Sequence, residues 1–149
     1  MSHALSARAR PLNKIPYAQG PIVYWMNREQ RVEDNWALLA AQSWAKKQGV
    51  AFAVAHNLMP KFLGGGARQW DFKVRGLQEV ETVLHKKGIP FFLFVGKESH
   101  KDMARWLKKL GVGGLVTDFF PLRVSMTWTN EVVKMLDIPV YQVDAHNVI

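Results

Sequence analysis

The sequence predicts an α/β fold: a Rossmann-like, doubly wound sheet of five parallel strands flanked by helices. Along the 149 residues, five short apolar runs alternate with amphipathic stretches of helical period. The runs are hydrophobic almost without interruption, which is typical of strands buried on both faces of a parallel sheet. Such alternation favours right-handed crossovers that place helices on both sides of the sheet.

The strands are expected at the apolar runs, after a polar, Pro-containing tail over residues 1–20. We expect a single domain over residues 21–149, because a chain of this size buries roughly 68–70% of its unfolded surface in one core. The predicted strands are Pro21–Met26, Val50–Asn57, Ile89–Gly96, Gly114–Phe120 and Ile138–Ala145.

Four helices are expected between these five strands. Asp34 is the predicted N-cap of the first helix, and Ser99 with Asp102 forms a variant capping box for the third. The fourth follows Pro121, and the first three end at Gly49, Gly88 and Gly111. Apolar spacing predicts the core-facing residues: Trp36, Leu39, Ala40 and Trp44; Trp70, Val74, Leu77, Val80 and Leu84; Met103, Trp106, Leu107 and Leu110; Trp128, Val132, Met135 and Leu136.

Composition excludes several classes of function. The chain has no cysteine, and its five histidines are scattered without an HExxH pair, so neither thiolate chemistry nor a metal site is expected. No run has the length of a membrane span, the first twenty residues contain no signal-peptide core, and a cytoplasmic location is expected. The net charge of +8 permits contact with a polyanion. Its spread over several predicted helix faces favours solvated surface instead.

Motifs for nucleotide phosphates are incomplete. The first strand is followed by "NREQRVED", which lacks the glycines of a dinucleotide fingerprint. The glycine cluster of residues 64–70 lacks the GK[ST] ending of a phosphate loop and is interpreted as a surface loop. No GxSxG elbow is present, so nothing in the motifs indicates self-contained catalysis.

Ligands of doubly wound sheets bind beyond the carboxyl ends of the strands. The turn after the first strand holds two arginines and two acids, which either brace one another or serve a ligand; the residues alone leave both readings open. The side chains that follow the strands are Asn27, Arg28, Arg31, His56, Asn57, Lys97, Asp118, Phe119, Phe120 and Asp144.

Four ordered stretches resemble one protein family. "VYWMNREQRVEDNWALLAAQ" is similar to the opening signature of the photolyase and cryptochrome family, and in particular of the class II cyclobutane pyrimidine dimer photolyases. "RQWDFKVRGLQEVE", "LVTDFFPLR" and "PVYQVDAHNVI" resemble the same class in the same order, so the resemblance runs from Pro21 to Ile149. The segment "RVSMTWTNEVV" is less typical of this family than the segments around it.

The resemblance implies a light-driven DNA repair enzyme of two domains. The N-terminal α/β domain of such enzymes can hold an antenna pigment; the resemblance implies a hydroxy-deazaflavin first, with methenyltetrahydrofolate or FMN as alternatives. The C-terminal helical domain binds FAD and receives the damaged DNA. This chain matches the first domain and stops about where the linker would begin, so the FAD-binding domain is expected as its partner. The isolated domain is not expected to be catalytic.

The resemblance also implies where a pigment would lie. A planar ring needs an aromatic or apolar slot with a few convergent polar groups. The residues expected to line it are Met26, Asn27, Arg28, Arg31, Phe94, Asp118, Phe119 and Phe120. Two other functions stay open at this point: a free-standing nucleotide-binding or interaction module of the same fold, and a basic accessory domain that holds DNA.

Overall fold

The structure of the chain is a computed structural model that describes residues 9–27, 32–59 and 67–144. The strands in this part are β1 (Ala9–Pro11), β2 (Ile22–Trp25), β3 (Phe52–Leu58), β4 (Phe91–Val95), β5 (Gly114–Asp118) and β6 (Val140–Val143). The helices are α2 (Trp36–Gln48), α3 (Ala67–Lys86), α4 (Ser99–Leu110) and α5 (Arg123–Met135).

The strands form one sheet in the order β1-β6-β5-β2-β3-β4. The five predicted strands pair in parallel, which confirms the doubly wound α/β class. A sixth strand, β1, pairs antiparallel with β6 and comes from the segment expected to be a tail. The Arg10 guanidinium donates to the Gln142 side chain at 2.8 Å across this pair. The ordered domain therefore includes residues on the N-terminal side of Pro21.

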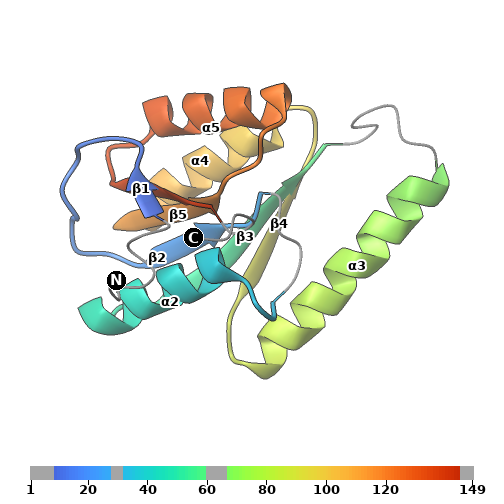
Figure 1. Ribbon diagram of the computed structural model, residues 1–149, viewed down its shortest axis with the longest axis horizontal. Helices are drawn as coiled ribbons and strands as arrows, with labels where there is room; N and C mark the ends of the chain where they lie inside the picture. Colours follow the sequence, from blue (N-terminus) through green and yellow to red (C-terminus); the bar gives the residue numbers. More distant parts are fainter. Residues whose placement is uncertain (1–8, 28–31, 60–66, 145–149) are drawn as a thin grey trace.

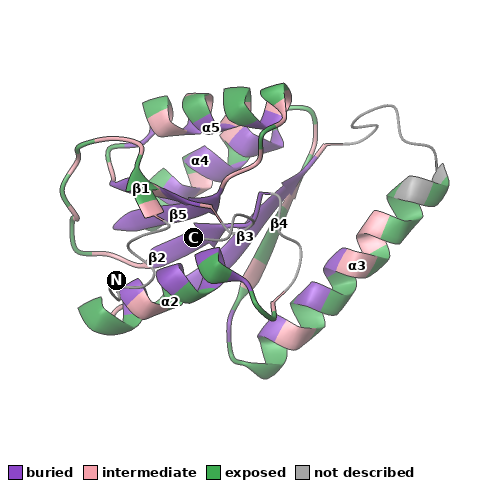
Figure 2. Cartoon of the chain, in the orientation of Figure 1, coloured by how far each residue is buried: buried purple, intermediate pink, exposed green. Residues whose placement is uncertain are grey.

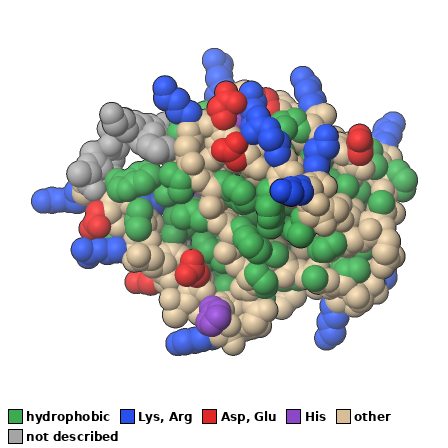
Figure 3. Space-filling model, turned by 180° about the vertical axis from the view of Figure 1, so that it is seen from behind, with side chains coloured by type: hydrophobic (Ala, Val, Ile, Leu, Met, Phe, Trp, Pro, Cys, Tyr) green, Lys and Arg blue, Asp and Glu red, His purple; other side chains and the backbone are tan. Residues whose placement is uncertain are grey.

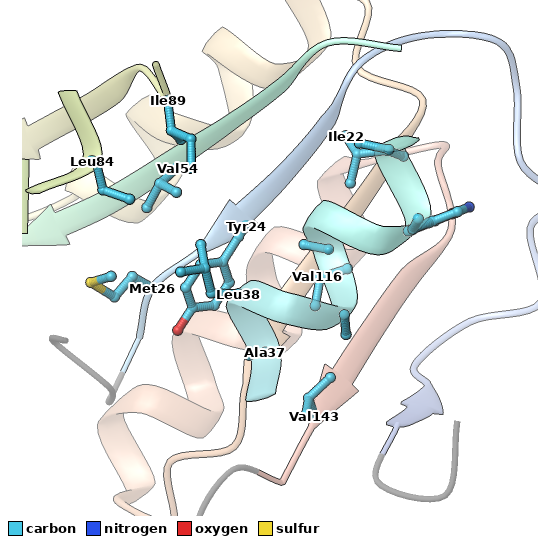
Figure 4. Packing of buried hydrophobic residues seen from close by; sticks show 14 of the residues in the cluster. Ile22, Tyr24, Met26, Ala37, Leu38, Val54, Leu84, Ile89, Val116 and Val143 are labelled. Carbon is cyan, nitrogen blue, oxygen red and sulfur yellow. The ribbon is translucent and has the colours of Figure 1, made fainter. Parts of the chain in front are cut away.

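Helices cover both faces of the sheet, as Figure 1 shows. α2 packs on one face of the sheet, where Leu38 lies against Tyr24. On the same face, Leu84 at the end of α3 and the following Ile89 pack against Val54 of β3 (Figure 4). α4 and α5 pack on the other face, over a second apolar cluster that contains Trp25 and Met103. β2 and β5 are buried along their full length, so they form the centre of the core between the two helical layers.

The start of α2 corrects the predicted cap by one residue. Asn35 is the N-cap, and its side-chain oxygen accepts a hydrogen bond from the Leu38 N–H at 2.9 Å. Asp34 instead lies in the turn with a positive φ of 54°. α2 faces the sheet with small residues such as Ala37 and Ala41, so Trp36 and Leu39 are exposed rather than buried as predicted. The predicted end at Gly49 is confirmed by its left-handed conformation.

α3 and β4 are more exposed than their apolar patterns predicted. Among the side chains of α3 that the structure describes, the buried ones are Leu77, Val80 and Leu84, all in its C-terminal half. The N-terminal end of the helix extends past the sheet (Figures 1 and 2). Trp70 is therefore exposed. β4 is the last strand of the sheet, and Leu93 and Val95 are exposed on it. The expected burial of every strand on both faces is thus wrong for β4, because α3 covers only its beginning.

α4 begins at Ser99 and ends before Gly111 as predicted, but the capping box is absent. The N-cap is Glu98, which makes no capping hydrogen bond with its side chain. Asp102 accepts a hydrogen bond from Arg105 at 2.8 Å instead. Leu110 is exposed because it lies in the last turn of α4, beyond the buried face formed by Met103 and Leu107.

Candidate functional site

The ends of β2 and β5 form the topological switch point of the sheet. From β2 the chain builds the sheet outward through β3 and β4, and it then returns to add β5 and β6 on the other side of β2. The Asn27 N–H, directly after β2, donates to Oδ1 of Asp118 at 2.6 Å. Beside this bond, the Thr117 hydroxyl donates to the Trp25 carbonyl at 2.9 Å. Both bonds fix the two strand ends to each other at the edge where such folds bind ligands.

The Asn27 side chain continues this network toward α5. Its amide donates weakly, at 3.4 Å, to the hydroxyl of Thr129, which in turn donates to the Ser125 carbonyl at 2.9 Å. The Ser125 hydroxyl is buried and has no hydrogen-bond partner among the residues that the structure describes. Polar groups from β2, β5 and α5 thus converge on the α5 side of the strand ends.

A second polar chain crosses the end of β3 toward α4. The Trp25 indole N–H donates to the Asn57 side-chain oxygen at 2.8 Å. The Asn57 amide then donates to the Ser99 hydroxyl at 3.4 Å. All three side chains are buried, and each bond satisfies a group that would otherwise be costly to bury. This chain fixes the first turn of α4 against the sheet.

His100 lies in the first turn of α4. Its Nε2–H donates to Glu131 of α5 at 2.7 Å, and its ring stacks on Trp128. The hydrogen bond from His100 lowers the pKa of Glu131; desolvation opposes this shift, and the charges of His100 and Lys101 add to it. This group ties α4 to α5 and stands at one border of the strand-end region.

His56 lies on the opposite face of β3, the face on which α2 and α3 pack. Its side chain is 1% exposed, and Nδ1 lies 2.6 Å from the Met26 carbonyl oxygen. Burial lowers the pKa of His56 to about 4; the bond to Met26 opposes this shift and the charge of Lys73 adds to it. Nε2 is buried without a hydrogen-bond partner among the described residues. Burial also lowers the pKa of Lys73 on α3.

The structure brings together some of the predicted pigment-lining residues and separates others. Asn27 and Asp118 are bonded, and Phe119 and Phe120 follow β5 directly, half-buried beside them. Met26 is fully buried in the cluster under α2. Phe94 lies on β4, two strands away from β2. It packs against Trp106 of α4, on the opposite face of the sheet from Met26. Arg28 and Arg31 lie outside the described residues.

Sequence reasoning left several of these groups out of the predicted site. His56 and Asn57 are readable as residues at the end of a strand, but nothing in the sequence shows that one bonds the Met26 carbonyl and the other the Trp25 indole. Thr129 has no sequence signal at all, because it reaches Asn27 only through the packing of α5. These residues were missed because their roles depend on tertiary contacts, which sequence motifs do not reveal.

Other features of the described residues do not compete with this region. A hollow of about 310 Å³, lined by Leu107, Val112 and Ile138 among others, lies at the amino ends of β5 and β6, the edge opposite to the site. The described part contains no group of three or more potential metal ligands. Within residues 9–27, 32–59 and 67–144, no helix combines the length and apolarity needed to span a bilayer.

Comparison with known proteins gives the family. The model of the DNA photolyase family matches residues 22–149. The deoxyribodipyrimidine photo-lyase of Potorous tridactylus is 45% identical over 130 residues, which cover 85% of this chain and 24% of that protein. The enzyme of the same name from Arabidopsis thaliana is 41% identical over 132 residues, covering 87% of this chain and 26% of that protein. The chain thus spans about a quarter of the length of these relatives.

Solved structures share the fold at low sequence identity. A class III photolyase from Agrobacterium tumefaciens superposes with a TM-score of 0.68 at 19% identity, over 87% of this chain and 26% of that one. An archaeal photolyase from Sulfolobus tokodaii, solved with two FAD molecules, gives 0.66 at 18% identity, over 83% of this chain and 29% of that one. With the family match and the identities above, the chain belongs to the DNA photolyase family and corresponds to the N-terminal domain of its class II members.

Proposed function

We propose that this chain is the antenna-binding domain of a photolyase that repairs cyclobutane pyrimidine dimers, and that the pigment lies beyond the ends of β2 and β5. The observation that carries the proposal is the bond between Asn27 and Asp118 at the switch point, with two half-buried phenylalanines directly after it. Ligand sites of doubly wound sheets lie at this position. A planar ring requires the aromatic surface and convergent polar groups found there.

The side chains present suit such a ring. Phe119 and Phe120 offer aromatic surface, and the carboxylate of Asp118 and the amide of Asn27 offer polar atoms that fix orientation. The buried strands beneath keep these groups in place and exclude water from the floor of the site. A bound antenna pigment supplies absorption of light and transfer of excitation energy to a reduced flavin. We assign hydroxy-deazaflavin as the first candidate, with methenyltetrahydrofolate and FMN as alternatives.

The partner implied by this function is a helical FAD-binding domain, through which damaged DNA would be bound and repaired. The archaeal relative from Sulfolobus tokodaii, whose second FAD is linked to a light-harvesting role, supports a pigment in this fold. The competing role as a basic DNA-holding domain has weaker support. On the face shown in Figure 3, Lys and Arg side chains are scattered around the outline, with acidic side chains among them and a broad hydrophobic area between.

Pigment binding is tested by titrating the 149-residue chain with each of the three compounds and following absorbance and fluorescence. Phe119→Ala is expected to weaken binding roughly 10-fold, because a lost aromatic contact costs about 1–1.5 kcal/mol. Phe72→Ala is the matched control, since Phe72 is 81% exposed on α3. If no compound produces a spectral change with the wild-type chain, the antenna function is refuted. ATP or AMP binding in its place would favour a nucleotide-binding module.

A further inference from the structure

The four helices of the described chain all end in basic side chains. A positive charge in the last turn offsets the negative end of the helix dipole, so each lysine has a local explanation when it is taken alone. The lysines in or directly after the last turns are Lys46 and Lys47 on α2, Lys86 and Lys87 at the end of α3, Lys108 and Lys109 on α4, and Lys134 on α5. They are far apart in the sequence, where nothing indicates a common site.

The fold brings these lysines to one edge of the domain. The strands from β2 to β6 are parallel, so each helix returns the chain from the carboxyl ends of the strands to their amino ends (Figure 1). Lys14 joins the same edge, because the side chain of the neighbouring Asn13 donates to the Ile138 carbonyl, just before β6, at 2.9 Å. We call these eight lysines, at the amino ends of the strands, the lysine edge.

Nearly all of the net charge of the chain lies on the lysine edge. The segments that build it contain eight lysines and one acid, Asp137, which gives +7 of the total of +8. The rest of the chain contains 12 basic and 11 acidic side chains and is almost neutral. These segments are residues 12–21, 45–51, 83–90, 107–113 and 132–139.

The charge of the lysine edge is also unpaired. All eight lysines are exposed, and none of them forms an ion pair with a described residue. Elsewhere on the surface, Arg105 pairs with Asp102, and Lys101 lies 3.3 Å from Glu98. Compensation of helix dipoles explains why a lysine stands at each helix end, but it does not explain why acids are nearly missing around them.

The partner that fits such an edge is an extended polyanion. Neighbouring strands lie about 4.8 Å apart, so the amino ends of five parallel strands span about 20 Å. Duplex DNA carries one negative charge per about 1.7 Å of its axis, so a duplex of that length presents on the order of ten phosphates. A small anion would meet only one pair of lysines. Lysine is a point charge that holds phosphate without reading bases.

The other side chains of this edge favour a duplex over two further polyanions. Leu110 is the only large apolar side chain exposed in the five segments, and no aromatic side chain is exposed there. Interfacial binding to a membrane uses several apolar anchors, and binding of single strands uses aromatic rings on which bases stack. The lysine edge offers neither.

We propose that the lysine edge binds duplex nucleic acid through its phosphates, without preference for sequence or damage. It lies at the edge of the sheet opposite to the carboxyl ends of β2 and β5, so it adds to the antenna site rather than replacing it. The inference does not rest on the antenna function.

The test measures fluorescence anisotropy of a labelled, undamaged DNA duplex of about 20 base pairs with the 149-residue chain. Wild type is expected to bind, and the affinity is expected to fall steeply between about 50 and 200 mM salt. The edge variant changes Lys46, Lys47, Lys108 and Lys109 to Gln. It is expected to bind roughly 10- to 100-fold more weakly at about 50 mM salt, with a salt slope lower by about one for each lost phosphate contact.

A matched variant controls for net charge. It changes Arg75, Lys97, Arg105 and Arg123, which are exposed and lie outside the edge segments, to Gln. Both variants lose four positive charges, but the matched variant is expected to keep most of the wild-type affinity. Replacing the four edge lysines by Arg keeps the charge and is expected to retain binding. Thermal unfolding checks that each variant folds.

The outcomes separate this proposal from the alternatives and from the antenna function. Equal losses in the edge and matched variants would refute the lysine edge, since net charge alone would then explain binding. Tighter binding of a duplex that contains a pyrimidine dimer would refute damage-independent binding. Binding to vesicles containing phosphatidylserine but not to the duplex would assign the edge to a membrane surface instead. If the duplex binds as expected but no pigment does, the lysine edge stands and the antenna function is refuted.

Discussion

The Asn27 N–H and the Asp118 carboxylate are joined by a hydrogen bond of 2.6 Å that spans the point where the strand order reverses. Both groups are buried. The bond satisfies a backbone N–H that has left the ladder of β2, and it places a carboxylate at the start of the segment that carries Phe119 and Phe120. One side chain therefore both closes the sheet and shapes the candidate site.

Asp118→Ala is expected to destabilise the chain by about 1–3 kcal/mol, because it leaves the buried Asn27 N–H without an acceptor. Urea unfolding measures this change. Asp118→Asn retains a side-chain oxygen and is expected to cost less. Asp137→Ala, at an exposed position, is expected to change stability by no more than about 0.5 kcal/mol. Equal losses for Asp118→Ala and Asp137→Ala would contradict the importance of the bond.

His56 is expected to make the chain less stable as the pH falls from about 6.5 to about 4. The pKa of His56 is lowered to about 4 in the folded chain, against about 6.5 when unfolded, so the unfolded state binds more protons in this window. The full contribution is about 3 kcal/mol, present above pH 6.5 and lost as the pH falls toward 4. The free energy of unfolding measured in urea at several pH values gives the slope.

His56→Gln removes this titration and is expected to flatten the pH dependence between pH 6.5 and 4 relative to wild type. The difference between the two proteins isolates His56 from the carboxylates that also titrate. His85→Gln, at an exposed position, serves as the control and is expected to retain the wild-type slope. An unchanged slope in His56→Gln would show that His56 is not held neutral by burial.

Two glycines are expected to respond in opposite directions to alanine. A Cβ at Gly114, the first residue of β5, would overlap the ring of Trp44, so Gly114→Ala is expected to cost about 1–3 kcal/mol. A Cβ at Gly76, inside α3, meets nothing within 4 Å. Gly76→Ala is therefore expected to stabilise the chain by about 0.5–1 kcal/mol through helix propensity. Thermal unfolding of both variants tests the pair, and a change of the same sign in both would contradict it.

The exposed outer strand β4 is expected to promote self-association. Val95 is 53% exposed on this strand, and an apolar edge strand offers unpaired backbone groups to another chain. Val95→Lys is expected to lower the associated fraction at high protein concentration, as measured by sedimentation velocity, with a stability change within about 0.5 kcal/mol. Leu110→Lys replaces a comparably exposed residue at the end of α4 and is expected to have little effect.

The sequence predicted the fold class because the apolar runs reflect burial directly. β2 and β5 are buried throughout, and these runs defined the parallel sheet. Gly49 and Gly111 also ended their helices as predicted, since only a left-handed residue completes these caps. Features that local chemistry alone determines, such as these helix ends, could therefore be predicted from the sequence pattern.

Prediction from sequence was less successful where tertiary contacts decide. Trp36 and Trp70 have the apolar character of core residues, but the direction in which α2 and α3 approach the sheet leaves both exposed. The short strand β1 lacked a recognisable pattern, because it is formed by pairing with β6 rather than by its own hydrophobicity. In the candidate site, Asn27 and Asp118 were predicted together, whereas the uses of His56 and Thr129 depend on contacts between distant segments.

The pairing of β1 with β6 has a consequence for how the chain is made. Ala9 is in register with Val143, so the first strand has to wait for the last one during synthesis. At about 5–20 residues per second, a ribosome takes on the order of ten seconds to produce the intervening chain. The sheet around β2 and β3 can assemble during that interval, whereas the outer edge of β5 stays unpaired until β6 has been translated. We expect the nascent chain to be most susceptible to proteases and chaperones at this outer edge.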